Sequence, residues 1–297
     1  MNEDVVKVIL DCKKDIWKTK ELFELVEDYF ENSRQTLGFC TVLEKCLKRA
    51  REGQLIIQVA LKQFEEDQSE GIDDEKKNYS KTLQELKNFR AAGDPFTEEF
   101  FLLFQSVYKQ QVSMLKTLQI KKSKLDKKLK SVKSWWRVSN IILGAAFASV
   151  LICSVVAAAI AAPPVVTALA AAAASLPLGS MGNWINSLWE KYENELKEQR
   201  EIMTAMWIVS DIAIKDLVSI RVLVDKLEIK IESMLQNADF ALQDEDAVML
   251  AIDEIKKKLC VFMQTIEDLS EHADTCSRHI RRQRTVILRR ITKYPSY

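Results

Sequence analysis

The chain contains an uninterrupted stretch of 52 residues, 138–189, with no Asp, Glu, Lys, Arg or His side chain. A helix rises about 1.5 Å per residue, so a stretch of this length could cross a hydrocarbon core of about 30 Å roughly twice. Pro163 and Pro164 stand at its centre, where two missing backbone donors should end a helix and turn the chain. The stretch therefore predicts a helical hairpin with transmembrane spans at about 139–162 and 165–183.

Charged and aromatic side chains mark both edges of this stretch. Only Asp126 opposes a group of basic residues before the first predicted span: Lys121, Lys122, Lys124, Lys127, Lys128, Lys130, Lys133 and Arg137. Because an excess of Lys and Arg marks the cytosolic side of a membrane, and a hairpin returns the chain to that side, both termini are expected to be cytosolic. Indole rings prefer the bilayer interface, so the predicted interface anchors are Trp135, Trp136, Trp184 and Trp189.

The second limb of the hairpin leaves two other structures open. This limb is rich in alanine and is interrupted by Pro177, Gly179 and Gly182, so it could enter the membrane only part of the way. The protein would then be peripheral, with a shallow hairpin. Small residues also let helices approach closely, so the hairpin could instead be buried inside a water-soluble bundle.

The regions on both sides of the stretch have the residue spacing of long helices. Apolar positions alternate by four and three residues along Cys40, Leu43, Leu47, Ala50, Gln54, Ile57, Leu61 and Phe64, and again along Val248, Ile252, Ile255, Leu259, Phe262, Ile266 and Leu269. This alternation keeps one apolar stripe on a helix, as in coiled coils. With only 7 Gly and 5 Pro, the chain has few positions suited to turns, which favours a few long helices.

The predicted fold is all-α, a long-helix bundle with coiled-coil-like arms that flank a two-helix transmembrane hairpin. Its parts are an N-terminal cytosolic arm at 1–137, the hydrophobic hairpin at 138–189 and a C-terminal cytosolic arm at 190–297. An acidic loop is expected around 65–74, and Asp94 is expected to cap a new helix. The stripes are expected to pack inside the protein. Pairing between chains is the alternative, so a homo-oligomer stays open.

The motifs of the common catalytic sites are missing. The chain has no glycine-rich phosphate loop, no nucleophile elbow and no Cys-x-x-Cys pair, so no catalytic residue, cofactor or metal is predicted. His272, Cys276 and His279 share one helix face and could hold a metal, but Cys276 belongs to the apolar stripe. Six scattered cysteines on apolar positions indicate reduced thiols rather than a disulfide framework. Because 43 basic residues balance 43 acidic ones, net charge gives no reason to expect nucleic acid.

Basic residues interleaved with apolar ones point to anionic lipid instead. Near the C-terminus, arginines alternate with Ile280, Ile287 and Ile291, a pattern that could lie against phospholipid headgroups. A solvated helix face is the alternative. The predicted headgroup contacts are Lys127, Lys128, Lys130, Lys133, Arg137, Arg281, Arg282 and Arg284.

Four runs of sequence resemble the plant integrin-like membrane proteins, also grouped as the uncharacterised protein family 0496. They are DYFENSRQTLGFCTVLEKCLKRARE, AAGDPFTEEFFLLFQSVYKQQVSML, VLICSVVAAAIAAPPVVTALAAAAA and IRVLVDKLEIKIESMLQNADFAL. The resemblance implies a multi-pass membrane protein with two adjacent spans, at the plasma membrane or an endomembrane, without catalytic residues. It also implies a role in contact between cell wall, plasma membrane and cytoskeleton. Family members usually have an additional N-terminal segment, so the chain resembles a shortened member.

These observations together predict a non-enzymatic structural or adaptor protein. It would link a membrane, most simply the plasma membrane, to cytosolic and possibly cytoskeletal protein partners through its helix faces. A membrane-remodelling or pore-forming helical protein is the alternative from another class, because long helices around an alanine-rich hairpin also suit that task.

Overall fold

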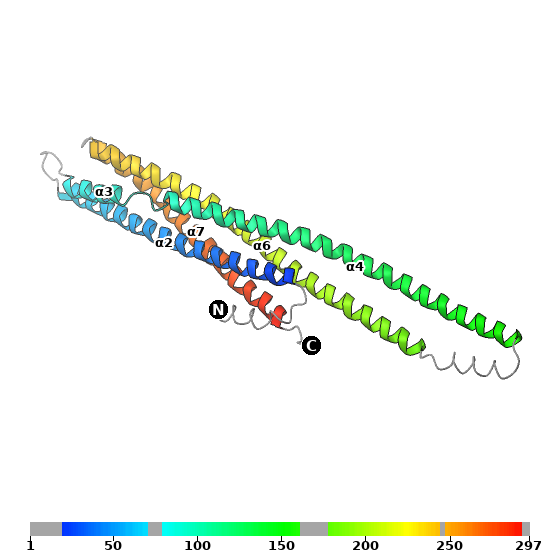
Figure 1. The fold of residues 1–297 in the computed structure, drawn as a ribbon. Helices are drawn as coiled ribbons and strands as arrows, with labels where there is room; N and C mark the ends of the chain where they lie inside the picture. Colours follow the sequence, from blue (N-terminus) through cyan, green and yellow to red (C-terminus); the bar gives the residue numbers. More distant parts are fainter. Residues whose placement is uncertain (1–19, 71–78, 161–177, 244–246, 293–297) are drawn as a thin grey trace. The chain divides into compact units, whose positions relative to one another are not determined.

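The computed structural model describes residues 20–70, 79–160, 178–243 and 247–292, and these residues are helical apart from short connections (Figure 1). The helices are α2 (Lys20–Glu70), α3 (Ser80–Ala92), α4 (Glu98–Ile160), α6 (Leu178–Gln243) and α7 (Val248–Thr292). The prediction of an all-α bundle of long helices is confirmed.

The chain divides into two compact units. Unit 1 comprises Met1–Lys116 and Ile208–Tyr297, and unit 2 comprises Thr117–Trp207. Helices α4 and α6 each contribute residues to both units. The N-terminal and C-terminal parts of the chain therefore fold together in unit 1.

The core of unit 1 follows the spacing of four and three residues that the sequence predicts. On α6 every such position is buried: Ala213, Leu217, Ile220, Val224, Leu227, Ile231, Met234, Ala238 and Ala241. The stripes of α2 and α7 join the same hydrophobic cluster. Apolar residues at this spacing stay on one side of a helix, so each long helix can bury a continuous seam against its neighbours.

Aromatic rings and one glycine bring α4 and α3 against α2. Phe39 lies 5.5 Å from Phe100 and 5.7 Å from Phe104 between ring centroids, which joins α2 to α4. Helix α3 packs on α2 beside Gly53, where a β-carbon would stand 3.4 Å from the ring of Phe89. The absence of a side chain at Gly53 thus lets α3 approach closely.

Two predicted boundaries differ from the structure. Helix α2 continues to Glu70 and so includes the first part of the expected acidic loop, whose residues 71–74 lie outside the described residues. Within this helical part, buried Asp67 accepts a hydrogen bond of 2.9 Å from Thr82 of α3. Gly93 ends α3 with a φ of 63°, as expected of a glycine after a helix. Asp94 does not cap α4: its carboxylate accepts a hydrogen bond from the Phe96 amide at 2.8 Å within the turn.

The described part of unit 2 is formed by the later part of α4 and the beginning of α6. Asp126 pairs with Arg200 at 2.6 Å, and Lys133 pairs with Glu193 at 3.8 Å. Residue numbers rise along one helix as they fall along the other, so the two helices are antiparallel. The buried apolar side chains are Leu118, Leu125 and Val132 on α4, and Leu196, Ile202, Met203 and Met206 on α6.

The predicted transmembrane hairpin is corrected. Among the residues that the structure describes, no helix is long and apolar enough to cross a membrane. The predicted span 139–162 is not a separate helix, because its residues up to Ile160 end the 63-residue α4, whose earlier part is rich in lysine. Of the second span, 165–183, only the residues from Leu178 lie in a described helix, and α6 then continues into charged sequence. Pro163 and Pro164 lie outside the described residues.

Candidate functional site

Large apolar and aromatic side chains are exposed at one level of unit 2, which we call the aromatic band. Its members are Trp135, Trp136, Val138 and Ile141 on α4, and Trp184, Leu188 and Tyr192 on α6. Trp135 is 61% exposed, Trp184 is 64% exposed and Ile141 is 70% exposed. Exposed apolar side chains of this size, concentrated in one place, indicate a surface that contacts another apolar phase or a partner.

The structure brings three of the four predicted tryptophan anchors together. Trp136 Nε1 donates a hydrogen bond of 3.2 Å to Asn186 Oδ1, which ties α4 to α6 at the level of the aromatic band. Trp135 and Trp184 stand exposed on the same two helices, whereas Trp189 is half-buried. Sequence reasoning missed the remaining members of the band. Ile141 lies inside the predicted span 139–162, whereas Val138, Leu188 and Tyr192 lie just outside the two predicted spans.

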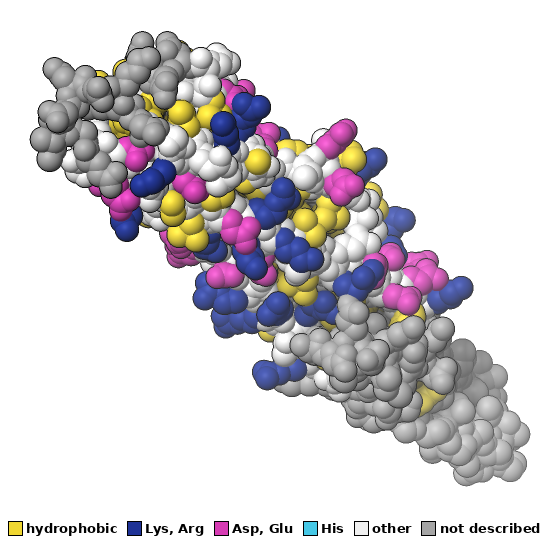
Figure 2. All heavy atoms as spheres, turned by 90° about the vertical axis from the view of Figure 1, so that its left-hand side faces the viewer, with side chains coloured by type: hydrophobic (Ala, Val, Ile, Leu, Met, Phe, Trp, Pro, Cys, Tyr) yellow, Lys and Arg dark blue, Asp and Glu magenta, His cyan; other side chains and the backbone are white. Residues whose placement is uncertain are grey.

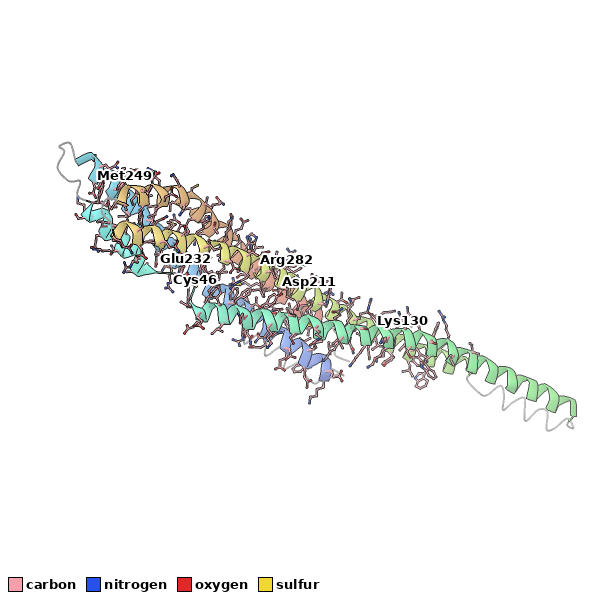
Figure 3. All side chains as sticks on the ribbon, turned by 90° about the horizontal axis from the view of Figure 1, so that it is seen from above. Cys46, Lys130, Asp211, Glu232, Met249 and Arg282 are labelled. Carbon is pink, nitrogen blue, oxygen red and sulfur yellow. The ribbon has the colours of Figure 1, made fainter. Side chains whose placement is uncertain are left out.

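Basic side chains lie on α4 directly before the aromatic band. The predicted headgroup contacts of this helix, Lys127, Lys128, Lys130, Lys133 and Arg137, are all exposed, and Figure 3 labels Lys130 among them. Unit 2 has 11 Lys and Arg residues against 6 Asp and Glu, a net charge of +5. Because the whole chain is neutral, unit 1 has a net charge of −5. The positive charge is therefore concentrated in the unit that exposes the aromatic band.

Local pairs hold part of this charge in place. Lys122 Nζ stands 5.5 Å from the ring centroid of Trp207 on α6. Lys197 donates a hydrogen bond of 2.9 Å to Glu193, and this bond lowers the pKa of the Glu193 carboxyl. The Glu193 carboxylate thus has one lysine partner on its own helix and another, Lys133, on α4.

The predicted arginine contacts of α7 lie in unit 1 and do not share one surface. Arg281 and Arg282 are exposed. Arg284 is only 7% exposed, with its guanidinium carbon 5.6 Å from the ring centroid of Phe30 and close to buried Tyr29. This placement corrects the prediction for Arg284, which cannot reach a lipid headgroup from inside the bundle.

A polar cavity of about 460 Å³ lies between α2 and α7 in unit 1. Its lining consists of Glu44 on α2 with Gln264, Glu267, Asp268, Ser270, Glu271, Asp274, Ser277, Arg278 and Arg281 on α7. Side chains of both charge signs thus surround it. The wider surface is also mixed: Figure 2 shows basic, acidic and hydrophobic side chains interspersed over the described atoms of one face.

The three residues weighed as metal ligands have other partners. His279 Nδ1 lies 2.9 Å from Asp216 Oδ2, and His272 Nδ1 lies 2.8 Å from the backbone oxygen of Asp268. Cys276 is buried. Over the described ranges, no group of three or more His, Cys, Asp or Glu residues is arranged to hold a metal ion.

Comparison with known proteins identifies relatives along the whole chain. A family model described as "Protein of unknown function (DUF677)" matches residues 1–291. The chain is 60% identical to UPF0496 protein At4g34320 of Arabidopsis thaliana over 296 residues, which cover 100% of this chain and 78% of the relative. It is 58% identical to UPF0496 protein 1 of Oryza sativa subsp. japonica over 303 residues, with the same coverage of 100% and 78%.

A third relative agrees with the first two. UPF0496 protein At2g18630 of Arabidopsis thaliana is 55% identical over 296 residues, which cover 100% of this chain and 74% of the relative. No solved structure matches the chain. Identity of this extent over the full chain shows that the protein belongs to the UPF0496 (DUF677) family of plant proteins.

Proposed function

We propose that the protein is a non-enzymatic structural adaptor that binds the surface of an anionic membrane through unit 2 and binds protein partners through unit 1. The main support is the aromatic band, which lies beside exposed lysines in the unit with a net charge of +5. The plasma membrane is the proposed location, with unit 1 on the cytosolic side.

The chemistry of unit 2 suits the interface of a bilayer. Indole rings such as those of Trp135 and Trp184 combine a large apolar area with one N–H donor, and this combination favours the level of the headgroups. Each Lys or Arg near an anionic leaflet adds about 1 kcal/mol of attraction. A surface that combines exposed indole rings with basic side chains can bind a membrane without any catalytic group.

Exposed apolar residues on α6 support the second half of the proposal. Val218, Val222, Ile229 and Phe240 follow one another at intervals of 4, 7 and 11 residues, which places them on one face of the helix, opposite its buried seam. The partner that fits such a stripe is an amphipathic helix with apolar residues at the same spacing.

Sedimentation with vesicles tests membrane binding. The full chain should sediment with vesicles that contain phosphatidylserine and much less with pure phosphatidylcholine. The triple variant Lys127→Glu, Lys128→Glu, Lys130→Glu should lose most of this binding, because three attractive charges become repulsive. Arg281→Glu with Arg282→Glu on α7 is the matched control and should bind as the wild type does. Equal binding by the triple variant and the wild type would contradict the role of unit 2. Release of an enclosed dye would favour a pore-forming protein instead.

A photo-crosslinking amino acid at position 229 tests partner binding in plant cells. We expect covalent adducts with another protein, lost when Val222→Glu is added. The same amino acid at exposed position 52, on α2 and away from this stripe, is the control and should give few adducts. Adducts only between copies of this chain would indicate a homo-oligomer, and their complete absence would contradict the adaptor proposal.

A further inference from the structure

Two exposed serines of unit 2 lie between the basic residues of α4 and the aromatic band. Ser131 directly follows Lys130, and Ser134 directly precedes Trp135. Both serines are exposed, whereas Val132 between them is only 7% exposed. Because residues one and two positions apart on a helix point in different directions, both serines lie away from the buried side of α4.

Helical spacing places Ser131 between two lysines and an exposed indole ring. Residues three and four positions apart are neighbours on the surface of a helix. Lys127 and Lys128 lie four and three positions before Ser131, and Trp135 lies four positions after it. All three of these side chains are exposed. A phosphate on Ser131 would therefore stand beside two of the basic side chains that the proposed function assigns to lipid headgroups.

Ser134 has surroundings of the same kind. Lys130 lies four positions before it, and Arg137 lies three positions after it. Val138, an exposed member of the aromatic band, lies four positions after it. A negative charge on this serine would thus separate a basic side chain from the apolar surface that follows it.

We propose that Ser131 and Ser134 are phosphorylated by an ATP-dependent protein kinase, and that this modification releases unit 2 from an anionic membrane. The proposal rests on the membrane binding proposed above. Kinases distinguish their substrates partly by charge pattern, and the lysines that precede both serines suit a kinase whose substrate groove is acidic. The regulated surface and the modified residues are therefore the same face of one helix.

The modification transfers one phosphoryl group from ATP to each serine. The serine Oγ attacks the γ-phosphorus, a new O–P bond forms, and the bond from that phosphorus to the β–γ bridging oxygen breaks, so that ADP leaves. The hydroxyl proton passes to a carboxylate of the kinase and from there to solvent. Nothing is oxidised or reduced. Each phosphoserine has a charge of about −1.5 to −2 at neutral pH.

Charge and hydration both explain why phosphate would release the protein. Two phosphates lower the net charge of unit 2 from +5 to about +1. One unit of charge beside an anionic leaflet changes the affinity about fivefold, so a single phosphate should weaken binding about 25-fold. A phosphate also resists removal from water, so it would hold Trp135 and Val138 away from the bilayer interface.

Vesicle sedimentation of the full chain with phosphoserine incorporated at position 131 tests the release. Binding to vesicles of phosphatidylcholine and phosphatidylserine should weaken about 25-fold relative to the unmodified chain, with the same helix content by circular dichroism. Phosphoserine at position 106, an exposed serine of α4 in unit 1, is the matched control and should leave binding unchanged. Equal weakening at both positions would overturn the proposal, because the effect would then not belong to this face of unit 2. Unmodified chain that fails to bind would refute the proposed function itself, whereas binding that phosphoserine at 131 does not weaken would refute only this inference.

Mass spectrometry of the full chain from plant cells tests whether the serines are modified. The cells are lysed with phosphatase inhibitors and separated into membrane and soluble fractions. We expect phosphate on Ser131 or Ser134, at a higher proportion in the soluble fraction than in the membrane fraction. The double variant Ser131→Ala, Ser134→Ala should shift towards the membrane fraction, whereas Ser106→Ala should distribute as the wild type does. Absence of phosphate from both serines in both fractions would overturn the proposal, and so would an equal proportion in the two fractions.

Discussion

Units 1 and 2 are built from the same kind of long helix, but they differ in how many of their large apolar side chains are buried. In unit 1, the seam of α6 from Ala213 to Ala241 is buried, because α2, α3 and α7 are present beside α4 and α6. In the described part of unit 2, α4 and α6 have only each other, and Trp135 and Trp184 remain exposed. A helix pair can bury one narrow seam, whereas a bundle buries a wider face of each helix. Apolar surface left over in unit 2 is therefore available for binding.

The largest expected difference between the units follows from truncating one apolar side chain in each. Leu227→Ala in unit 1, at a position that is 0% exposed, should leave a cavity and lower the free energy of unfolding by about 2–5 kcal/mol. Trp184→Ala in unit 2 should lower it by less than about 0.5 kcal/mol, because the ring is 64% exposed. Urea denaturation followed by circular dichroism measures both. Equal losses would show that unit 2 has a core of its own around Trp184.

The next largest loss of stability is expected when a buried hydrogen bond between two helices is removed. Gln111 of α4 donates a hydrogen bond of 2.9 Å to Thr36 Oγ1 of α2 inside unit 1. Gln111→Ala should lower the free energy of unfolding by about 1–3 kcal/mol, since buried groups lose a partner. Exposed Gln105→Ala on the same helix is the control and should change little. Similar values for the two variants would mean that the seam between α2 and α4 does not depend on this bond.

Glycine substitutions should show whether backbone entropy also limits the stability of unit 1. A β-carbon at Gly38, within α2, would meet nothing within 4 Å, so Gly38→Ala should raise the free energy of unfolding by about 0.5–1 kcal/mol. Gly93 has a φ of 63°, and Gly93→Ala should lower the free energy of unfolding by about 1 kcal/mol. Thermal unfolding measures both. A loss at Gly38 would contradict the open space described there.

The smallest effect is expected for the ion pair of unit 2. Asp126 and Arg200 are 2.6 Å apart but half-exposed, so Asp126→Asn should lower the free energy of unfolding by about 0.2–1 kcal/mol. The loss should vanish at about 1 M salt, where charges are screened within about 3 Å. The double variant with Arg200→Gln should lose no more than either single variant if the pair acts as a unit. A loss that persists at high salt would reveal a packing role.

Much of unit 1 could be predicted from residue spacing. The alternation of four and three residues along α2 and α7 predicted both the helices and the buried side of each. The same rule contained the signal for Arg284, which lies four residues after Ile280 and three before Ile287 and so belongs to the buried stripe. Its charge was given more weight than its position, and the prediction of a headgroup contact was wrong for that reason.

The hairpin prediction shows what residue spacing and composition do not determine. An uncharged stretch indicates that its residues avoid water, but it does not say whether they form separate helices or extend existing ones. Residues up to Ile160 are the end of α4, and those from Leu178 begin α6. The helices that border the stretch are continuous with charged, amphipathic sequence, so no separate span forms in the described residues.

The amino-acid sequence by itself determined that this chain forms long helices, which side of each is apolar, and where glycine ends α3, because these features depend on local spacing and backbone freedom. Only the tertiary structure decided which apolar residues have neighbours. It enclosed Arg284 and left Trp135 and Trp184 exposed. Contacts between residues far apart in the chain depend on how helices are arranged around one another, and the period of a single helix has no information about that arrangement.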